Sequence, residues 1–292
     1  MKNITNGVWV TMITPFTKDS KIDYTAVEAL VEWYISKNVD GIFAVCQSSE
    51  MFFLTFEERF ELAKFVINAV NKRVEVIVSG NTHDDIAVQL KEARAFAELE
   101  PNAMVFLTNR MNVDATLKEM PEEVALGLYE CPYPSKRLLT DAEMEYLVKS
   151  GRFVFLKDTS CDAQIMRRRA EIVAGTAFKV YNANAATLYE TLKFGYNGYC
   201  GVMGNFHPDL YAWLYWNLND ARAERVANFL SMMSVIECRE YPLCAKYYLS
   251  LFEGLGINKL CRSRPDSHGP ALGHELKSLY ELTQEIRSSI LS

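Results

Sequence analysis

FVFLKDTS, residues 153–160, joins four consecutive apolar residues to a lysine and three polar residues. An unbroken apolar run is typical of a strand in a parallel sheet that is buried on both faces. The stretch therefore predicts a buried strand over Phe153–Leu156, with Lys157 at its carboxyl end.

Similar short runs recur on both sides of this strand, and amphipathic segments with helical spacing separate most of them. Thr55 and Glu58 form a capping box at the start of one such helix. Eight regular strand–helix units predict an α/β chain that closes into a (β/α)8 TIM barrel. A doubly wound open sheet is the alternative, although it seldom needs eight units. The other predicted strands are Val8–Ile13, Gly41–Val45, Val74–Ser79, Ala103–Leu107, Val124–Tyr129, Phe178–Tyr181 and Tyr199–Met203.

Only helical patterns follow the last predicted strand. They cover approximately residues 208–217, 219–234, 241–253 and 272–290. We therefore expect a barrel with the catalytic site over residues 1–207 and a C-terminal helical region over 208–292. The polar segment 261–270 is expected to be a solvated loop, with a subunit contact as the alternative.

The composition excludes several classes of partner. The 292 residues include 37 acidic and 31 basic side chains, which gives a formal net charge of −6. This balance argues against binding to nucleic acid or to an anionic membrane. No apolar run approaches the ~20 residues that span a bilayer, and the N-terminal residues do not resemble a secretory signal. Seven scattered cysteines are typical of reduced thiols in a cytoplasmic protein.

Familiar cofactor motifs are missing from the sequence. No GxGxxG follows the first predicted strand, and no Gly-Lys-Ser/Thr phosphate loop occurs. The four histidines have no zinc-ligand spacing. We therefore expect neither a cofactor nor a metal. A metal-dependent barrel enzyme is a competing hypothesis, but its only candidate ligands are the scattered Glu50, Glu130 and Asp158.

In a (β/α)8 barrel, the active-site residues lie at the carboxyl ends of the strands. Lys157 is expected to be partly desolvated there, which lowers its pKa and supplies a neutral amine. A neutral amine attacks a ketone and forms a Schiff base, through which carbon–carbon bonds break or form. The alternative is a structural lysine paired with Asp158 or with a helix C-terminus.

Two further groups of residues lie at predicted strand ends. Tyr129 ends the strand before Lys157, so its phenol can exchange protons beside the amine, or it can simply cap the rim. Ser48 and Ser49 form a polar turn that can hold a carboxylate, although such turns are often only turns.

Together these residues resemble the dihydrodipicolinate synthase / N-acetylneuraminate lyase family of class I aldolases. The resemblance covers nearly the whole chain. Each motif is weak alone, but six in order at matching positions are specific. The matching stretches are Gly7–Phe16, the GTTGE-like Cys46-Gln47-Ser48-Ser49-Glu50, Gly80-Asn81, the YNxP-like Tyr129-Glu130-Cys131-Pro132, Lys157-Asp158-Thr159-Ser160, and Gly198–Val202 with Asn205.

The resemblance implies a class I lyase or dehydratase that needs no cofactor. It implies a 2-keto acid, such as pyruvate or a 2-keto-3-deoxy sugar acid, bound as an imine to Lys157. Tyr129 would be the acid/base phenol, and Ser48 and Ser49 would hold the substrate carboxylate. It also implies a homotetramer built as a dimer of dimers. Gln47, Thr159 and Cys200 occupy the remaining positions expected to bind substrate.

Departures from the motifs argue against a true dihydrodipicolinate synthase. Gln47 replaces the hydroxyl that relays protons in those enzymes, and Asn109-Arg110-Met111 stands where their second tyrosine is found. The position of their arginine after YNxP corresponds to the neighbourhood of Pro134, although Lys136 and Arg137 lie close to it. The segment from Asn109 to Tyr129 is also short, which predicts an abbreviated helix. Arg110 would place a positive charge at the mouth of the site and favour an acidic or hydroxylated substrate tail. A non-catalytic or regulatory ligand-binding homologue is the alternative.

Overall fold

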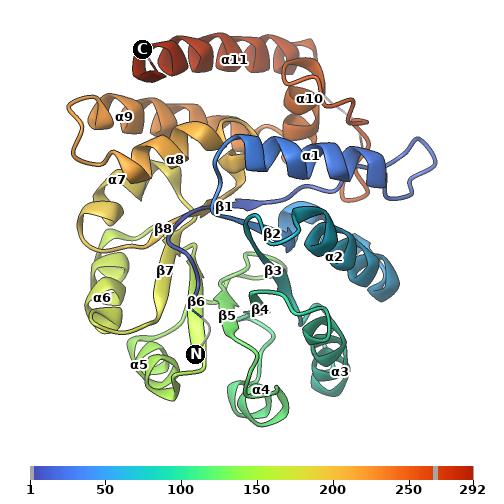
Figure 1. Ribbon diagram of the computed structural model, residues 1–292, viewed down its shortest axis with the longest axis vertical. Helices are drawn as coiled ribbons and strands as arrows, with labels where there is room; N and C mark the ends of the chain where they lie inside the picture. Colours follow the sequence, from blue (N-terminus) through green and yellow to red (C-terminus); the bar gives the residue numbers. More distant parts are fainter. Residues whose placement is uncertain (1–2, 266–268, 292) are drawn as a thin grey trace.

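The eight strands form a closed parallel barrel in chain order, so the (β/α)8 prediction is confirmed (Figure 1). The computed structural model describes residues 3–265 and 269–291. Every predicted strand is found, with small differences at its ends. The strands are β1 Gly7–Thr11, β2 Gly41–Val45, β3 Glu75–Ser79, β4 Ala103–Leu107, β5 Leu126–Tyr129, β6 Phe153–Asp158, β7 Lys179–Asn182 and β8 Gly198–Gly201.

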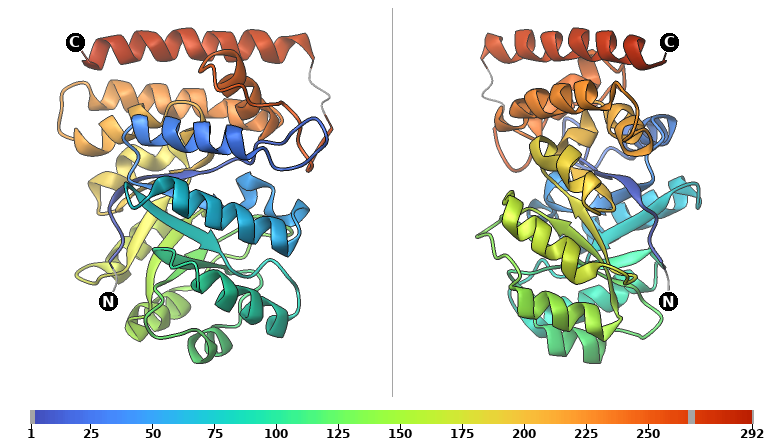
Figure 2. Two further views of the ribbon diagram at one scale, coloured as in Figure 1. Left: turned by 45° about the vertical axis from the view of Figure 1, so that its right-hand side comes forward. Right: turned by 90° about the vertical axis from the view of Figure 1, so that its left-hand side faces the viewer.

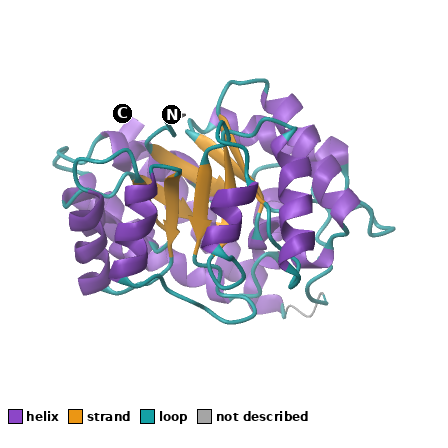
Figure 3. Cartoon of the chain, turned by 90° about the horizontal axis from the view of Figure 1, so that it is seen from below, coloured by secondary structure: helices purple, strands orange, loops and turns teal. Residues whose placement is uncertain are grey.

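Helices surround the barrel and bury the outer faces of its strands, as Figure 3 shows. Helix α4 has only seven residues, as expected for the short segment after β4. The helices of the ring are α1 Tyr24–Ser36, α2 Phe56–Val70, α3 Ile86–Ala97, α4 Val113–Glu119, α5 Asp141–Ser150, α6 Ala163–Val173, α7 Ala185–Lys193 and α8 Pro208–Trp216.

The barrel closes between β1 and β8 at a pair of glycines. Gly7 is the register partner of Gly198, and Gly198 has a φ of +155°. A Cβ atom at Gly198 would lie 1.8 Å from the carbonyl oxygen of Gly7. Only glycine permits this backbone approach, and the approach lets the first strand pair with the last.

Strand β8 ends earlier than the sequence pattern predicts. The expected strand reached Met203, but Val202–Asn205 forms a 3₁₀ turn instead. The Asn205 amide donates to the carbonyl oxygens of Thr11, at 2.8 Å, and Val202, at 2.9 Å. The backbone here is therefore satisfied by a side chain in place of a neighbouring strand.

Three helices and a 3₁₀ turn follow α8. They are α9 Ala223–Met233, the 3₁₀ turn Ser234–Cys238, α10 Leu243–Leu251 and α11 Pro270–Leu291. Figure 2 shows α11 along the outer edge of the molecule. None of the helices in the described part of the chain has the length and apolar character needed to cross a membrane. The division into 1–207 and 208–292 stays a prediction.

Candidate active site

The parallel register of β5 and β6 sets Tyr129 directly beside Lys157. The Lys157 Nζ atom lies 4.4 Å from the centroid of the Tyr129 ring. Both side chains are buried, and Lys157 is only 3% exposed. The barrel therefore brings together the amine and the phenol that the sequence singled out.

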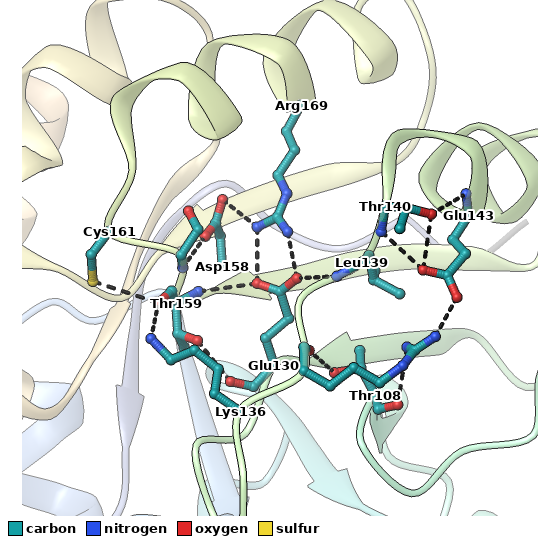
Figure 4. A network of polar contacts seen from close by, with 12 residues as sticks. Thr108, Glu130, Lys136, Leu139, Thr140, Glu143, Asp158, Thr159, Cys161 and Arg169 are labelled. Carbon is teal, nitrogen blue, oxygen red and sulfur yellow. Dashed lines mark hydrogen bonds and ion pairs between the residues drawn. The ribbon is translucent and has the colours of Figure 1, made fainter.

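A buried ion network holds the ends of β5 and β6 in this register (Figure 4). Arg169 of α6 forms ion pairs with both Glu130, which follows Tyr129, and Asp158, which follows Lys157. Glu130 also accepts a hydrogen bond of 2.8 Å from the Leu139 backbone N–H. Because the two carboxylates share one guanidinium, the strand ends that carry the amine and the phenol are fixed to each other.

Asp158 does not pair with Lys157, so that alternative for the lysine is wrong. Its carboxylate lies 2.8 Å from the Arg169 guanidinium and accepts a 2.5 Å hydrogen bond from the Tyr196 hydroxyl. Among residues 3–265 and 269–291, no carboxylate lies within ion-pair distance of the Lys157 amine. An approaching carbonyl group therefore does not have to displace a salt bridge.

The three carboxylates of the metal hypothesis are each paired with a cation. Glu130 and Asp158 contact Arg169, whereas the Glu50 carboxylate lies 2.7 Å from the buried amine of Lys246 in α10. Within the described residues, no group of three or more histidine, cysteine, aspartate or glutamate side chains could hold a metal ion.

A cavity of about 340 Å³ opens beside this pair of strands. Three predicted site residues, Gln47, Ser48 and Tyr129, form part of its wall. Lys157 and Ser49 are not lining residues, and Lys157 lies behind this wall against the Tyr129 ring. Among the described residues, the lining is Gln47, Ser48, Glu50, Phe52, Phe53, Tyr129, Pro132, Tyr133, Val202, Tyr241, Pro242, Ser263 and Arg264.

The turn after β2 places its side chains in different roles. The Ser49 hydroxyl donates to the Cys46 carbonyl oxygen at 2.7 Å and accepts from the Cys46 N–H at 2.6 Å, so it stabilises the turn itself. The Ser48 hydroxyl donates to Thr11 at 3.0 Å and faces the cavity. The Gln47 carbonyl oxygen accepts a 3.4 Å hydrogen bond from the Tyr129 hydroxyl.

Thr159 and Cys200 lie outside the cavity wall. The Thr159 hydroxyl donates to the Glu130 carbonyl oxygen at 2.7 Å, and this bond ties the loops after β5 and β6 together. Cys200 is fully buried in β8, and burial raises its pKa to about 12. Its thiol therefore stays protonated at neutral pH.

Arg110 does not line the cavity either. Its guanidinium forms an ion pair with Asp84 and lies 5.3 Å from the Phe52 ring centroid. The positive charge that Arg110 was expected to place at the rim is therefore paired with the Asp84 carboxylate.

Sequence reasoning missed three contributions from the C-terminal region. Tyr241 and Arg264 line the cavity, and Lys246 neutralises Glu50. The Asn205 amide donates to the Tyr241 hydroxyl at 2.9 Å. Since these residues follow the last strand by 40 residues or more, strand-end reasoning could not find them. Pro242, which precedes α10, is a local signal for the start of a helix, but it does not indicate a site.

The expectation of a solvated loop over 261–270 is wrong for its first part. The Arg262 guanidinium donates to both oxygens of Glu58 at 2.7 Å, and the Ser263 N–H donates to Glu50 at 2.7 Å. Residues 266–268 of this segment lie outside the described residues.

Burial controls the protonation of the phenols. It raises the pKa values of Tyr129 and Tyr241 well above that of a free tyrosine, because a phenolate would lose its hydration. Both phenols therefore stay protonated at neutral pH.

A parallel β/α barrel with a buried lysine and a phenol on adjacent strand ends defines the molecule as a member of the class I aldolase fold. The model of the dihydrodipicolinate synthetase family matches residues 4–265, so the chain belongs to that family. The resemblance inferred from the motifs is confirmed.

Curated and solved relatives agree with this assignment. A 4-hydroxy-tetrahydrodipicolinate synthase of Clostridium perfringens (strain SM101 / Type A) is 27% identical over 213 residues, 70% of this chain and 72% of that protein. A dihydrodipicolinate synthase structure from Bacillus anthracis superposes with a TM-score of 0.86 at 19% identity, and covers 94% of this chain and 97% of that one. One from Acinetobacter baumannii complexed with pyruvate gives 0.85 at 21% identity, covering 96% and 99%.

Proposed function

We propose that the protein is a class I lyase, an aldolase or dehydratase, that binds a 2-keto acid as an imine on Lys157. Pyruvate and 2-keto-3-deoxy sugar acids are the substrate types proposed. The observation that carries this proposal is the buried Lys157 amine 4.4 Å from the Tyr129 ring centroid, with no ion pair to a carboxylate in the described part of the chain. The family match and the pyruvate bound by the relative from Acinetobacter baumannii support it.

The proposed reaction begins when the Lys157 nitrogen attacks the keto carbon. The carbinolamine releases water, and the Tyr129 phenol supplies the proton that the leaving hydroxyl needs. The protonated imine then withdraws the electron pair of the adjacent carbon–carbon bond as an aldol cleaves. Tyr129, left as a phenolate by the dehydration, takes the proton of the hydroxyl on the departing carbon, and the cleavage leaves an enamine on Lys157. The Tyr129 phenol then returns that proton to the enamine carbon, which restores the protonated imine, and water hydrolyses this imine to release the keto acid and the free amine.

The remaining residues have proposed supporting roles. Ser48 offers a hydroxyl to the substrate carboxylate, and Gln47 orients the Tyr129 hydroxyl through their 3.4 Å hydrogen bond. Ser49, Thr159 and Cys200 act through the backbone and packing around these groups. Because Gln47 has no hydroxyl proton to relay, we propose a substrate other than that of dihydrodipicolinate synthase.

A ligand-binding homologue without turnover is the second candidate function. The altered turn at Cys46, Gln47 and Ser49 favours it, since this turn differs from the family motif. We also propose, from the family resemblance, a cytoplasmic homotetramer built as a dimer of dimers. Sedimentation velocity would test that assembly.

The proposal is tested by trapping the imine. Incubation with pyruvate and borohydride should attach one reduced pyruvyl group to Lys157, which peptide mass spectrometry would locate. Lys157→Ala should abolish the adduct, whereas Lys136→Ala, which removes a nearby exposed amine, should leave it unchanged. A panel of 2-keto acids that leaves no adduct on the wild-type protein would refute the imine. An adduct without turnover of any sugar acid would favour the ligand-binding function.

A further inference from the structure

Arg264 is anchored in the cavity wall by the two residues before it. The guanidinium of Arg262 binds Glu58 through two hydrogen bonds of 2.7 Å and donates to the carbonyl oxygen of Ser20. The Ser263 backbone N–H donates to Glu50 at 2.7 Å. These bonds fix the chain immediately before Arg264, which lines the cavity.

Glu50, the other charged residue among the described residues of the wall, does not neutralise Arg264. One Glu50 oxygen lies 2.7 Å from the Lys246 amine and the other accepts from Ser263, and both Glu50 and Lys246 are fully buried. Among residues 3–265 and 269–291, no carboxylate lies within ion-pair distance of the Arg264 guanidinium. Because Lys246, which lies outside the wall, neutralises Glu50, Arg264 is the charged side chain of the described wall that has no described carboxylate partner.

The cavity has room for more than a pyruvyl unit. Its volume of about 340 Å³ falls within the range of small-molecule sites, whereas pyruvate fills only a small part of such a space. Phe52, Phe53 and Tyr133 supply much of the remaining wall. A substrate held as an imine would extend its other end along this aromatic surface.

We propose that Arg264 binds a second anionic group, a carboxylate or a phosphate, at the far end of the substrate. A guanidinium binds either group through two parallel hydrogen bonds. The substrate class is therefore a 2-keto acid with an acidic tail. This inference rests on the proposed imine chemistry and makes Arg264, in place of Arg110, the residue that selects the tail.

The test compares 2-keto acids that share a head and differ in their tails. Half-saturating concentrations for borohydride trapping are measured with pyruvate, a neutral-tailed 2-keto acid, 2-ketoglutarate and a phosphorylated 2-keto acid. The wild-type protein should favour one of the anionic tails, and which one it favours distinguishes carboxylate from phosphate. Arg264→Gln should raise the half-saturating concentration of that compound about tenfold, since a charge-assisted pair is lost, and leave pyruvate unchanged. Arg264→Lys should restore part of the preference.

Arg110→Gln is the matched control, because it removes the other arginine near the rim. It should leave the preference intact, and a loss there with none in Arg264→Gln would overturn the inference. Equal trapping of neutral and anionic tails by the wild-type protein would also overturn it while the imine stands. If no 2-keto acid is trapped, the binding of glutarate and of its monoamide, measured by calorimetry, still tests the anion site. Binding of glutarate that Arg264→Gln abolishes supports the anion site, and its absence refutes it.

Discussion

The Tyr129 hydroxyl is the proton-transfer group of the proposed mechanism, and burial raises its pKa and keeps it protonated. Its register partner is Lys157, and Gln47 accepts its hydrogen bond at 3.4 Å. The ring packs against the lysine, whereas the proposed mechanism assigns proton transfer to the hydroxyl alone. These two contributions can be separated by removing the oxygen and keeping the ring.

Tyr129→Phe should therefore slow turnover far more than it weakens substrate binding. We expect kcat to fall by about 10²–10⁴-fold, the usual contribution of a general acid or base, with KM changed by less than about threefold. Steady-state assays would measure both constants with the substrate found by screening, and borohydride trapping would report the imine. A kcat within twofold of the wild-type value would show that another group transfers the proton.

The sequence could predict that Lys157 and Tyr129 lie side by side, because both residues are on neighbouring strands. Lys157 and Tyr129 could be selected because each directly follows an apolar run and the two strands are neighbours in sequence. Arg110 could not be assessed, because its partner Asp84 comes from the loop after the preceding strand. Ion pairing between loops depends on their three-dimensional paths, which strand periodicity does not encode.

At the scale of elements, α8 is joined to α11 through a buried histidine. His207 precedes α8 and is fully buried, and its Nδ1 atom lies 3.5 Å from the Thr283 hydroxyl in α11. Burial lowers the pKa of His207 to about 3, and the nearby Arg287 adds to this effect while Asp209 opposes it. The native protein therefore keeps this imidazole neutral under conditions in which the unfolded chain would protonate it.

The free energy of unfolding should consequently fall as the pH is lowered below about 6.5. An unfolded histidine binds its proton near pH 6.5, whereas native His207 does not bind one until the pH approaches about 3. Between pH 6.5 and 5 this difference costs about 2 kcal/mol. Urea unfolding at several pH values would measure the slope, which His207→Gln should reduce. Substitution of the exposed His83 by Gln should leave it unchanged, and an equal slope in all three proteins would contradict the assignment.

At the scale of the whole molecule, the C-terminal region completes the site that the barrel begins. Lys246 of α10 joins Glu50, which follows β2, and it also donates to the Leu260 carbonyl oxygen at 2.6 Å. Tyr241 and Arg264 add a phenol and a cation to the wall. The cavity therefore depends on contacts between segments about 200 residues apart in the chain.

Lys246→Met should destabilise the protein because it leaves Glu50 buried without its cation. The expected loss is about 3–5 kcal/mol in the free energy of unfolding, the usual effect of breaking a buried pair. The double variant Glu50→Gln with Lys246→Met removes both charges and should recover a large part of that loss. Urea denaturation of the two single variants and the double variant gives the coupling energy. A double variant whose loss equals the sum of the single losses would show that the two groups do not interact.

The sequence by itself determined the barrel, the family and the Lys157–Tyr129 pair. Short apolar runs, helix caps and strand-end residues are local features, and a parallel barrel places consecutive strand ends side by side. Only the tertiary structure decided which charges remain available. Arg169 forms ion pairs with Glu130 and Asp158, and Asp84 forms an ion pair with Arg110. Arg264, which follows the last strand by more than 60 residues, lines the cavity. These outcomes depend on distances between segments remote in sequence, and electrostatic interactions follow such distances in space.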